Sequence, residues 1–254
     1  MSETVSLRRV VVLGAASAVA EATCRALAEQ GAHLALLGRD GERLQSIATD
    51  LKVRGAATAF TLAKDLAAAD DAAETLAACA RAIGPIDAVL LFYGVLGDQD
   101  AAERDVREAK RLIDVNFTSA AQWAIAGAAA VEDKPNGVLL AISSVAGDRG
   151  RRSNYVYGAA KGALSILMQG IAHRFGAKAG GPRAVSIKLG FVDTPMTAHV
   201  QKGGPLWATP AQVAPIIVDA MERGGPMIYA PWFWRWIMLA IRMTPQAIFN
   251  KVNL

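Results

Sequence analysis

The chain has 254 residues, of which 53% are apolar and 20% are charged, a balance typical of one or two globular domains. The net charge of +4 is mild, and basic and acidic side chains alternate through most of the sequence, which argues against a nucleic-acid-binding surface. The two cysteines and three histidines lack the spacing of metal ligands, so we expect no metal site.

From the N-terminus onward, short β-rich apolar runs alternate with longer segments of helical period. Strands are predicted at residues 8–13, 32–37, 57–62, 86–92, 137–142, 184–189 and 227–229. Helices are predicted at about 18–30, 40–54, 69–83, 102–131, 154–176 and 209–223. The last helix starts at a capping box, Thr209 to Gln212, with Pro210 in its first turn.

This alternation predicts an α/β fold, a Rossmann-type doubly wound parallel sheet. The long helix 102–131 is inferred from apolar residues at helical spacing, which include Val106, Ile113, Ala124 and Ala128. No linker or repeat interrupts the pattern, so we predict a single domain at residues 1–230. A hydrophobic C-terminal segment, residues 231–254, follows it and is not an independent domain.

The turn after the first predicted strand is a candidate cofactor site. Gly14 and the run Ser17, Ala18 and Val19 would place small residues and a helix N-terminus against a phosphate. The glycine motif is incomplete, because Ala18 and Ala20 stand where glycines are usual. A tight strand–helix turn that binds no ligand would have the same sequence.

The ends of the second and third predicted strands supply two further candidates. Arg39 stands near the position where an acid would hold ribose hydroxyls, and its guanidinium suits a 2′-phosphate, which favours NADPH and leaves NADH as the alternative. Asp65 would accept the adenine amino group. The ordinary alternatives are a solvated loop charge for Arg39 and a turn cap for Asp65.

Tyr157 and Lys161 are spaced to share one face of a helix. A nearby ammonium lowers the pKa of a phenol, which would make Tyr157 a better acid–base catalyst. Ser144 lies at the carboxyl end of the fifth predicted strand, the sheet edge where doubly wound folds bind ligands. Its hydroxyl would hold a substrate carbonyl while Tyr157 supplies the proton.

Ser144, Tyr157 and Lys161 resemble the catalytic triad of the short-chain dehydrogenase/reductase family, and the resemblance covers essentially the whole chain. It implies NAD(P)H-dependent reduction of a ketone to a secondary alcohol by a homodimer or homotetramer. In this resemblance Asn116 supports a proton-relay water, and Val192 and Thr194 bond the cofactor.

Two segments depart from the family pattern. The usual Asn-Asn-Ala-Gly is Leu91-Phe92-Tyr93-Gly94 here, which keeps only Gly94 as a cofactor-binding candidate. Leu189 replaces the usual proline before Gly190.

Two features concern the substrate. Arg149, Arg151 and Arg152 precede the catalytic helix and form a candidate phosphate clamp, with solvated loop charges as the alternative. The run 231–242 is too short and too charged to span a bilayer, but it suits an interfacial segment in peripheral contact with a membrane. Alternatively, it packs against a dimer partner or covers the pocket.

A narrower resemblance involves residues 94–98, the arginine-rich run into residues 154–158, and residues 248–251. These segments are similar to the reductase subunits of decaprenylphosphoryl-ribose 2-epimerases. This implies a lipid-linked 2-keto pentose substrate, a flavoprotein oxidase partner, and a cytoplasmic location on the inner face of the membrane. The alternatives are a soluble reductase of another hydrophobic ketone, such as an acyl or steroid-like compound, and a non-catalytic nucleotide-binding regulatory protein.

Overall fold

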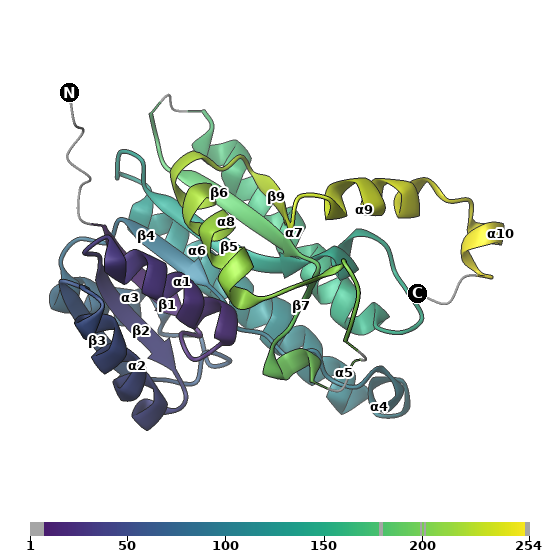
Figure 1. The fold of residues 1–254 in the computed structure, drawn as a ribbon, viewed down its shortest axis with the longest axis horizontal. Helices are drawn as coiled ribbons and strands as arrows, with labels where there is room; N and C mark the ends of the chain where they lie inside the picture. The colour runs from purple at the N-terminus through teal and green to yellow at the C-terminus, as the bar shows by residue number, and fades with distance from the viewer. Residues whose placement is uncertain (1–7, 178–179, 199, 201, 252–254) are drawn as a thin grey trace.

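The computed structural model describes residues 8–177, 180–198, 200 and 202–251. Their centre is a parallel sheet with the strand order β3-β2-β1-β4-β5-β6-β9 (Figure 1). The strands are β1 (Arg9–Leu13), β2 (His33–Gly38), β3 (Thr58–Ala63), β4 (Ala88–Leu91), β5 (Val138–Ser144), β6 (Arg183–Leu189) and β9 (Met227–Ala230). A separate two-stranded ladder pairs β7 (Phe191–Val192) with β8 (Trp207–Ala208).

Helices cover both faces of the sheet, which confirms the predicted doubly wound α/β fold. One apolar layer contains α1 (Ala18–Glu29), α2 (Gly41–Val53) and α8 (Pro210–Arg223). The opposite layer contains α3 (Ala72–Ile83), α6 (Ser119–Val131) and α7 (Tyr155–Phe175). Because both faces are buried, the central strands are apolar almost throughout, as in the run Val10 to Leu13, whose four residues are fully buried.

The strand order reverses between β1 and β4, which pair with each other in the middle of the sheet. Crossover connections leave in opposite directions on the two sides of such a switch point, so a crevice opens at the carboxyl ends of these strands. The loops after β1, β4 and β5 therefore meet at one edge of the sheet, where they build the site described below.

The single helix predicted at 102–131 is wrong in detail. Asp105 ends α4 (Gln99–Arg104) with an extended backbone, and its carboxylate caps α5 (Val106–Ile113) by accepting a bond from the Arg107 N–H at 2.9 Å. A π-helical turn, η1 (Asp114–Thr118), then joins α5 to α6. Such a turn holds one extra residue and rotates the helix face that follows it. Val106, at the start of α5, is exposed, whereas Ala124 and Ala128 in α6 are buried.

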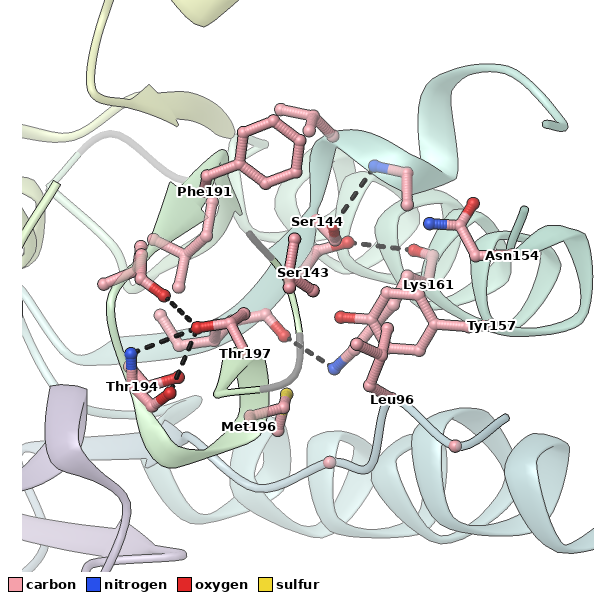
Figure 2. A pocket seen from close by; sticks show the side chains of 18 of the residues that line it. Leu96, Ser143, Ser144, Asn154, Tyr157, Lys161, Phe191, Thr194, Met196 and Thr197 are labelled. Carbon is pink, nitrogen blue, oxygen red and sulfur yellow. Dashed lines mark hydrogen bonds between the residues drawn. The ribbon is translucent and has the colours of Figure 1, made fainter. Parts of the chain in front are cut away.

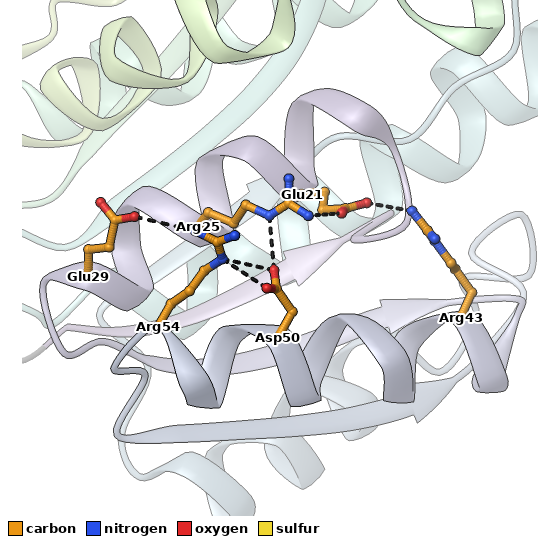
Figure 3. A network of polar contacts seen from close by, with 6 residues as sticks. All are labelled: Glu21, Arg25, Glu29, Arg43, Asp50 and Arg54. Carbon is orange, nitrogen blue, oxygen red and sulfur yellow. Dashed lines mark hydrogen bonds and ion pairs between the residues drawn. The ribbon is translucent and has the colours of Figure 1, made fainter.

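Ion pairs join α1 to α2 along the length of the two helices (Figure 3). Arg25 contacts Asp50 at 2.9 Å, and Glu21 pairs with Arg25 at 2.6 Å and with Arg43 at 2.7 Å. Arg54 also contacts Asp50, at 3.0 Å. Exposed pairs contribute little singly, but this network gives both helices polar contacts where their apolar packing ends.

The C-terminal segment predicted from residue 231 forms α9 (Trp234–Met243) and α10 (Gln246–Phe249), which extend beyond β9 at one end of the molecule (Figure 1). Trp234 and Met238 are buried and share an apolar cluster with Val145. The inner face of α9 thus packs on the body of its own chain. In the part of the chain that the structure describes, no helix is long and apolar enough to cross a membrane.

Candidate active site

A cavity of about 1160 Å³ lies at the carboxyl edge of the sheet (Figure 2). The start of α1 and the ends of β4, β5 and β6 all contribute to its wall. Of the predicted site residues, the cavity is lined by Ser17, Ala18, Val19, Gly94, Ser144, Arg151, Tyr157, Lys161, Val192 and Thr194. The fold therefore brings most of the candidates into one space, although they are spread over most of the sequence.

The start of α1 forms one wall of the cavity. Gly14 turns the chain with a φ of +86°, and a side chain there would lie 2.8 Å from the Cβ of Tyr93. Ser17 caps the helix by accepting a bond from the Ala20 N–H at 3.2 Å. Among the described residues, no acceptor meets the backbone N–H groups of Ala18 and Val19. These free donors, at the positive end of the helix dipole, suit a phosphate.

Ser144, Tyr157 and Lys161 lie together in another part of the cavity wall, which is formed by the end of β5 and by α7 (Figure 2). Ser144 ends β5, and both Ser144 and Tyr157 line the cavity. Lys161 lies one turn further along α7, and its Nζ donates to the Ile142 carbonyl at 3.0 Å. Nζ is 6.0 Å from the centroid of the Tyr157 ring.

Three glycines that sequence reasoning missed bring Ser144 and Tyr157 together. The turn η2 (Val145–Asp148) follows Ser144 and packs directly on α7. A side chain at Gly147 would lie 2.6 Å from the Gly162 nitrogen, and one at Gly158 would lie 2.7 Å from the Ala146 carbonyl. The available signal was the four-residue spacing of Gly158 and Gly162, which presents a small face of the helix to a neighbouring backbone.

Burial controls the protonation of the two titratable catalytic candidates. It raises the pKa of Tyr157 to about 12, and the neighbouring Ser144 hydroxyl opposes that shift. It also lowers the pKa of Lys161 to about 8. The lowered phenol pKa expected from a neighbouring ammonium is therefore not found, because desolvation of the phenolate raises the pKa. The phenol is thus protonated at neutral pH and able to donate its proton.

Asn116 lies in the π-turn and is fully buried. Its Oδ1 accepts a bond from the Val95 N–H at 3.1 Å, and its Nδ2 donates to the Val95 carbonyl at 2.8 Å. The neighbouring Gly94 is confined, because a side chain there would lie 2.7 Å from Asn116 Oδ1 and 3.1 Å from Lys161 Nζ. Asn116 therefore fixes the loop after β4 directly beside Lys161.

The loop after β6 contributes Val192 and Thr194 to the cavity wall. Thr197, which sequence reasoning missed, holds this loop by donating to the Val192 carbonyl at 2.8 Å and accepting a bond from the Thr194 N–H at 3.2 Å. The same loop begins at Gly190, which is covered by the Trp234 indole of α9, since a Cβ at Gly190 would lie only 1.8 Å from Nε1. The C-terminal segment thus contacts this loop, but none of its described residues lines the cavity.

Arg39 and Asp65 follow β2 and β3 and are both exposed outside the cavity. Asp65 caps its own turn, since its Oδ1 accepts a bond from the Ala67 N–H at 3.1 Å. Both lie after strands on the same side of the switch point as β1.

The three arginines predicted to act together are separated. Arg149 donates to the carbonyls of Ile241 and of Thr244, the latter at 2.6 Å. Its guanidinium stacks 3.8 Å from the centroid of the Phe249 ring. Carbonyl oxygens at the C-terminal end of a helix attract a cation. Arg149 therefore holds the C-terminal segment and does not line the cavity. Arg152 is exposed, and of the three only Arg151 lines the cavity.

The cavity therefore combines free amide donors at a helix N-terminus with a protonated phenol, a serine hydroxyl and a buried lysine. Such a set can hold a phosphate-bearing group at one wall and transfer a proton to an oxygen near the other.

Comparisons with known proteins agree with this geometry. The family model for the short chain dehydrogenases matches residues 8–204. An uncharacterised oxidoreductase of Mycobacterium tuberculosis is 33% identical over 246 residues, and one of Streptomyces coelicolor is 32% identical over 246 residues; each alignment covers 96% of both chains. A solved short-chain dehydrogenase/reductase from Brucella melitensis has the same fold, with a TM-score of 0.78 and 24% identity over 90% of this chain and 96% of that one.

Proposed function

The chain belongs to the short-chain dehydrogenase family and is an NAD(P)-dependent oxidoreductase, and we propose that it reduces a ketone to a secondary alcohol in the cavity beside Tyr157. The observation that carries this proposal is that Ser144, the protonated Tyr157 phenol and Lys161 line one cavity, with Lys161 Nζ 6.0 Å from the centroid of the Tyr157 ring. A non-catalytic nucleotide-binding protein would need none of these three groups in one cavity.

The cavity fits a nicotinamide dinucleotide. The free amides of Ala18 and Val19 would take its phosphates, and the loop that carries Val192 and Thr194 would cover its nicotinamide end. The ribose would lie beside Gly94 and Lys161, which both line the cavity. When bound, the reduced cofactor supplies a hydride to the carbonyl carbon.

The chain's own residues would handle the proton. Ser144 donates a hydrogen bond that orients the substrate carbonyl, and Tyr157 gives its phenolic proton to the carbonyl oxygen, which becomes the hydroxyl of the product. Lys161 stabilises the phenolate that remains and holds the cofactor ribose. Asn116 keeps the neighbouring loop in place and supports the water that returns a proton to Tyr157.

We further propose that NADPH is preferred over NADH. Arg39 is exposed at the end of β2, where it is free to bind a 2′-phosphate, and Gly38 offers no acid to the ribose hydroxyls. Asp65, at the end of β3, is the proposed partner of the adenine. Replacing Arg39 by Leu is expected to reduce kcat/KM for NADPH by about 10- to 100-fold and to leave that for NADH unchanged. An unaltered ratio of the two constants would remove Arg39 from the cofactor site.

The proposed substrate is the 2-keto pentose of a polyprenyl phosphate, produced by a flavoprotein oxidase partner. Support comes from the narrower resemblance in residues 94–98 and 248–251, from Arg151 in the cavity wall, and from the exposed apolar side of α9. We also propose that the enzyme is cytoplasmic, peripheral on the inner face of the membrane, and a homodimer or homotetramer. The competing proposal is a soluble reductase of an acyl or steroid-like ketone.

One assay separates these substrates. The keto sugar is generated in situ by a flavin oxidase acting on a prenyl-phosphate ribose, and consumption of NADPH is followed with and without the oxidase. Oxidase-dependent consumption supports the lipid-linked sugar. No consumption, together with good turnover of simple hydrophobic ketones, keeps the reductase and discards that substrate.

A further inference from the structure

Arg151 is a buried cation in the turn between β5 and α7. Only 9% of its surface is exposed, and its Nε meets no acceptor among the described residues. Burial lowers the pKa of its guanidinium, which the charge of Asp148 opposes. A guanidinium taken out of water in this way needs an acceptor, since it has five donors and loses their hydration.

Asp148, the carboxylate whose charge acts on Arg151, already has two other partners. Asp148 Oδ1 contacts the Lys188 ammonium, and its Oδ2 accepts a bond from the Tyr229 hydroxyl at 2.7 Å. Asp148 therefore attracts Arg151 through space but gives it no hydrogen bond. This uncompensated charge lies in the turn that leads directly into the catalytic helix α7.

A second unpartnered group lies beside it. Asn154 precedes α7, and its backbone N–H donates to the Arg151 carbonyl at 3.1 Å. Its side-chain Oδ1 is buried and, within the described part of the chain, has no donor. Both Arg151 and Asn154 line the cavity that Tyr157 also lines. One wall of the cavity thus has a cation, Arg151, and a neutral acceptor, Asn154 Oδ1. The Arg151 Nε and the Asn154 Oδ1 each lack a hydrogen-bond partner among the described residues.

We propose that Arg151 and Asn154 form a substrate subsite, in which Arg151 binds an anionic oxygen group, a phosphate or a carboxylate, and Asn154 accepts a bond from a neighbouring hydroxyl. The subsite rests on the proposed function only in that the ketone lies at Tyr157. It is separate from the place proposed for the cofactor phosphates, since those lie at the first turn of α1, whereas this pair lies between β5 and α7.

Calorimetry on the protein saturated with NADP⁺ tests the subsite without turnover, because the cofactor site is then filled. The probes are farnesyl phosphate, farnesoic acid and farnesol, which share a chain and differ in the head group. We expect the better of the two anions to bind about 10- to 100-fold more tightly than farnesol, as a charge-assisted bond predicts. A preference for the phosphate or for the carboxylate then identifies the natural head group.

Two variants make the result specific. Arg151→Met is expected to bind all three probes equally, while Arg152→Met, in the same turn but outside the cavity, keeps the preference of the wild type. Affinity for NADP⁺ and the circular dichroism spectrum confirm that each variant is folded. Equal binding of farnesol and both anions by the wild type, or an equal loss in both variants, overturns the subsite. Ketone reduction by the wild type is assayed separately, so either proposal can fail alone.

Discussion

At the scale of single residues, desolvation is the effect that governs the site. Tyr157 and Lys161 both lie on α7, which packs on the turn after β5. Burial moves their pKa values toward the neutral forms, to about 12 and about 8. The phenol keeps its proton, as a proton donor for ketone reduction must. The lysine remains largely charged at neutral pH. Because its pKa is about 8, a small rise in pH removes much of that charge.

The burial of Lys161 has a consequence for stability. Its folded-state pKa, about 8, lies below the ordinary value of 10.5, so between those values the unfolded chain holds more protons. Stability of the cofactor-free protein should therefore rise with pH in that window, by at most about 1.4 kcal/mol per pH unit from this group. The raised pKa of Tyr157 makes stability fall as pH rises, but only above the ordinary tyrosine pKa of 10.

Urea unfolding across this pH range, compared between the wild type and Lys161→Met, isolates the contribution of the lysine. The variant should show a flatter profile from pH 8 to 10 than the wild type. Parallel profiles would mean that Lys161 titrates normally in the folded protein.

At the scale of elements, residues with local signals were predictable and contacts between distant elements were not. The capping box at Thr209 forms as expected, with the Gln212 N–H donating to the Thr209 hydroxyl at 3.3 Å. Ser144, Tyr157 and Lys161 could be found because the ends of the strands and the helix spacing place them. The break at Asp105 could not, since apolar spacing continues across it. The docking of Trp234 on Gly190 depends on a contact that no local pattern encodes.

The docking of α9 is testable through two tryptophans of the same helix. Trp234 is 3% exposed and packs edge-on to Phe191, with ring centroids 5.2 Å apart, whereas Trp236 is 58% exposed. Trp234→Ala should reduce the free energy of unfolding by about 3–5 kcal/mol. Trp236→Ala, the matched control, should change it by less than about 0.5 kcal/mol. Similar effects of the two substitutions in urea unfolding would show that α9 is not docked in this way.

At the scale of the whole molecule, α9 and the turn before it carry a ridge of exposed apolar side chains. This tail ridge is formed by Trp232, Trp236, Leu239 and Met243. Arg235 and Arg242 are exposed on the same helix. Because Trp234 and Arg149 hold α9 against the body, the ridge is presented in a fixed orientation. Aromatic side chains between arginines suit the surface of an anionic bilayer.

Sedimentation with phosphatidylglycerol vesicles tests the tail ridge. The wild type should bind them, more weakly as salt is added, and the double variant Trp232→Ser/Trp236→Ser should bind at least about tenfold more weakly. Ile166→Ser, which removes an equally exposed apolar side chain from α7, serves as the control. If the control weakens binding as much as the double variant, the tail ridge is not the membrane contact.

The central claim is that Tyr157 protonates a ketone in a nicotinamide-dependent reduction. The most direct measurement is the steady-state consumption of NADPH with a hydrophobic ketone by the wild type and by Tyr157→Phe, after binding of NADPH to both has been shown by fluorescence. The account predicts that the variant binds NADPH as tightly as the wild type and loses about 10²- to 10⁴-fold in kcat. Near-native turnover by Tyr157→Phe would contradict it.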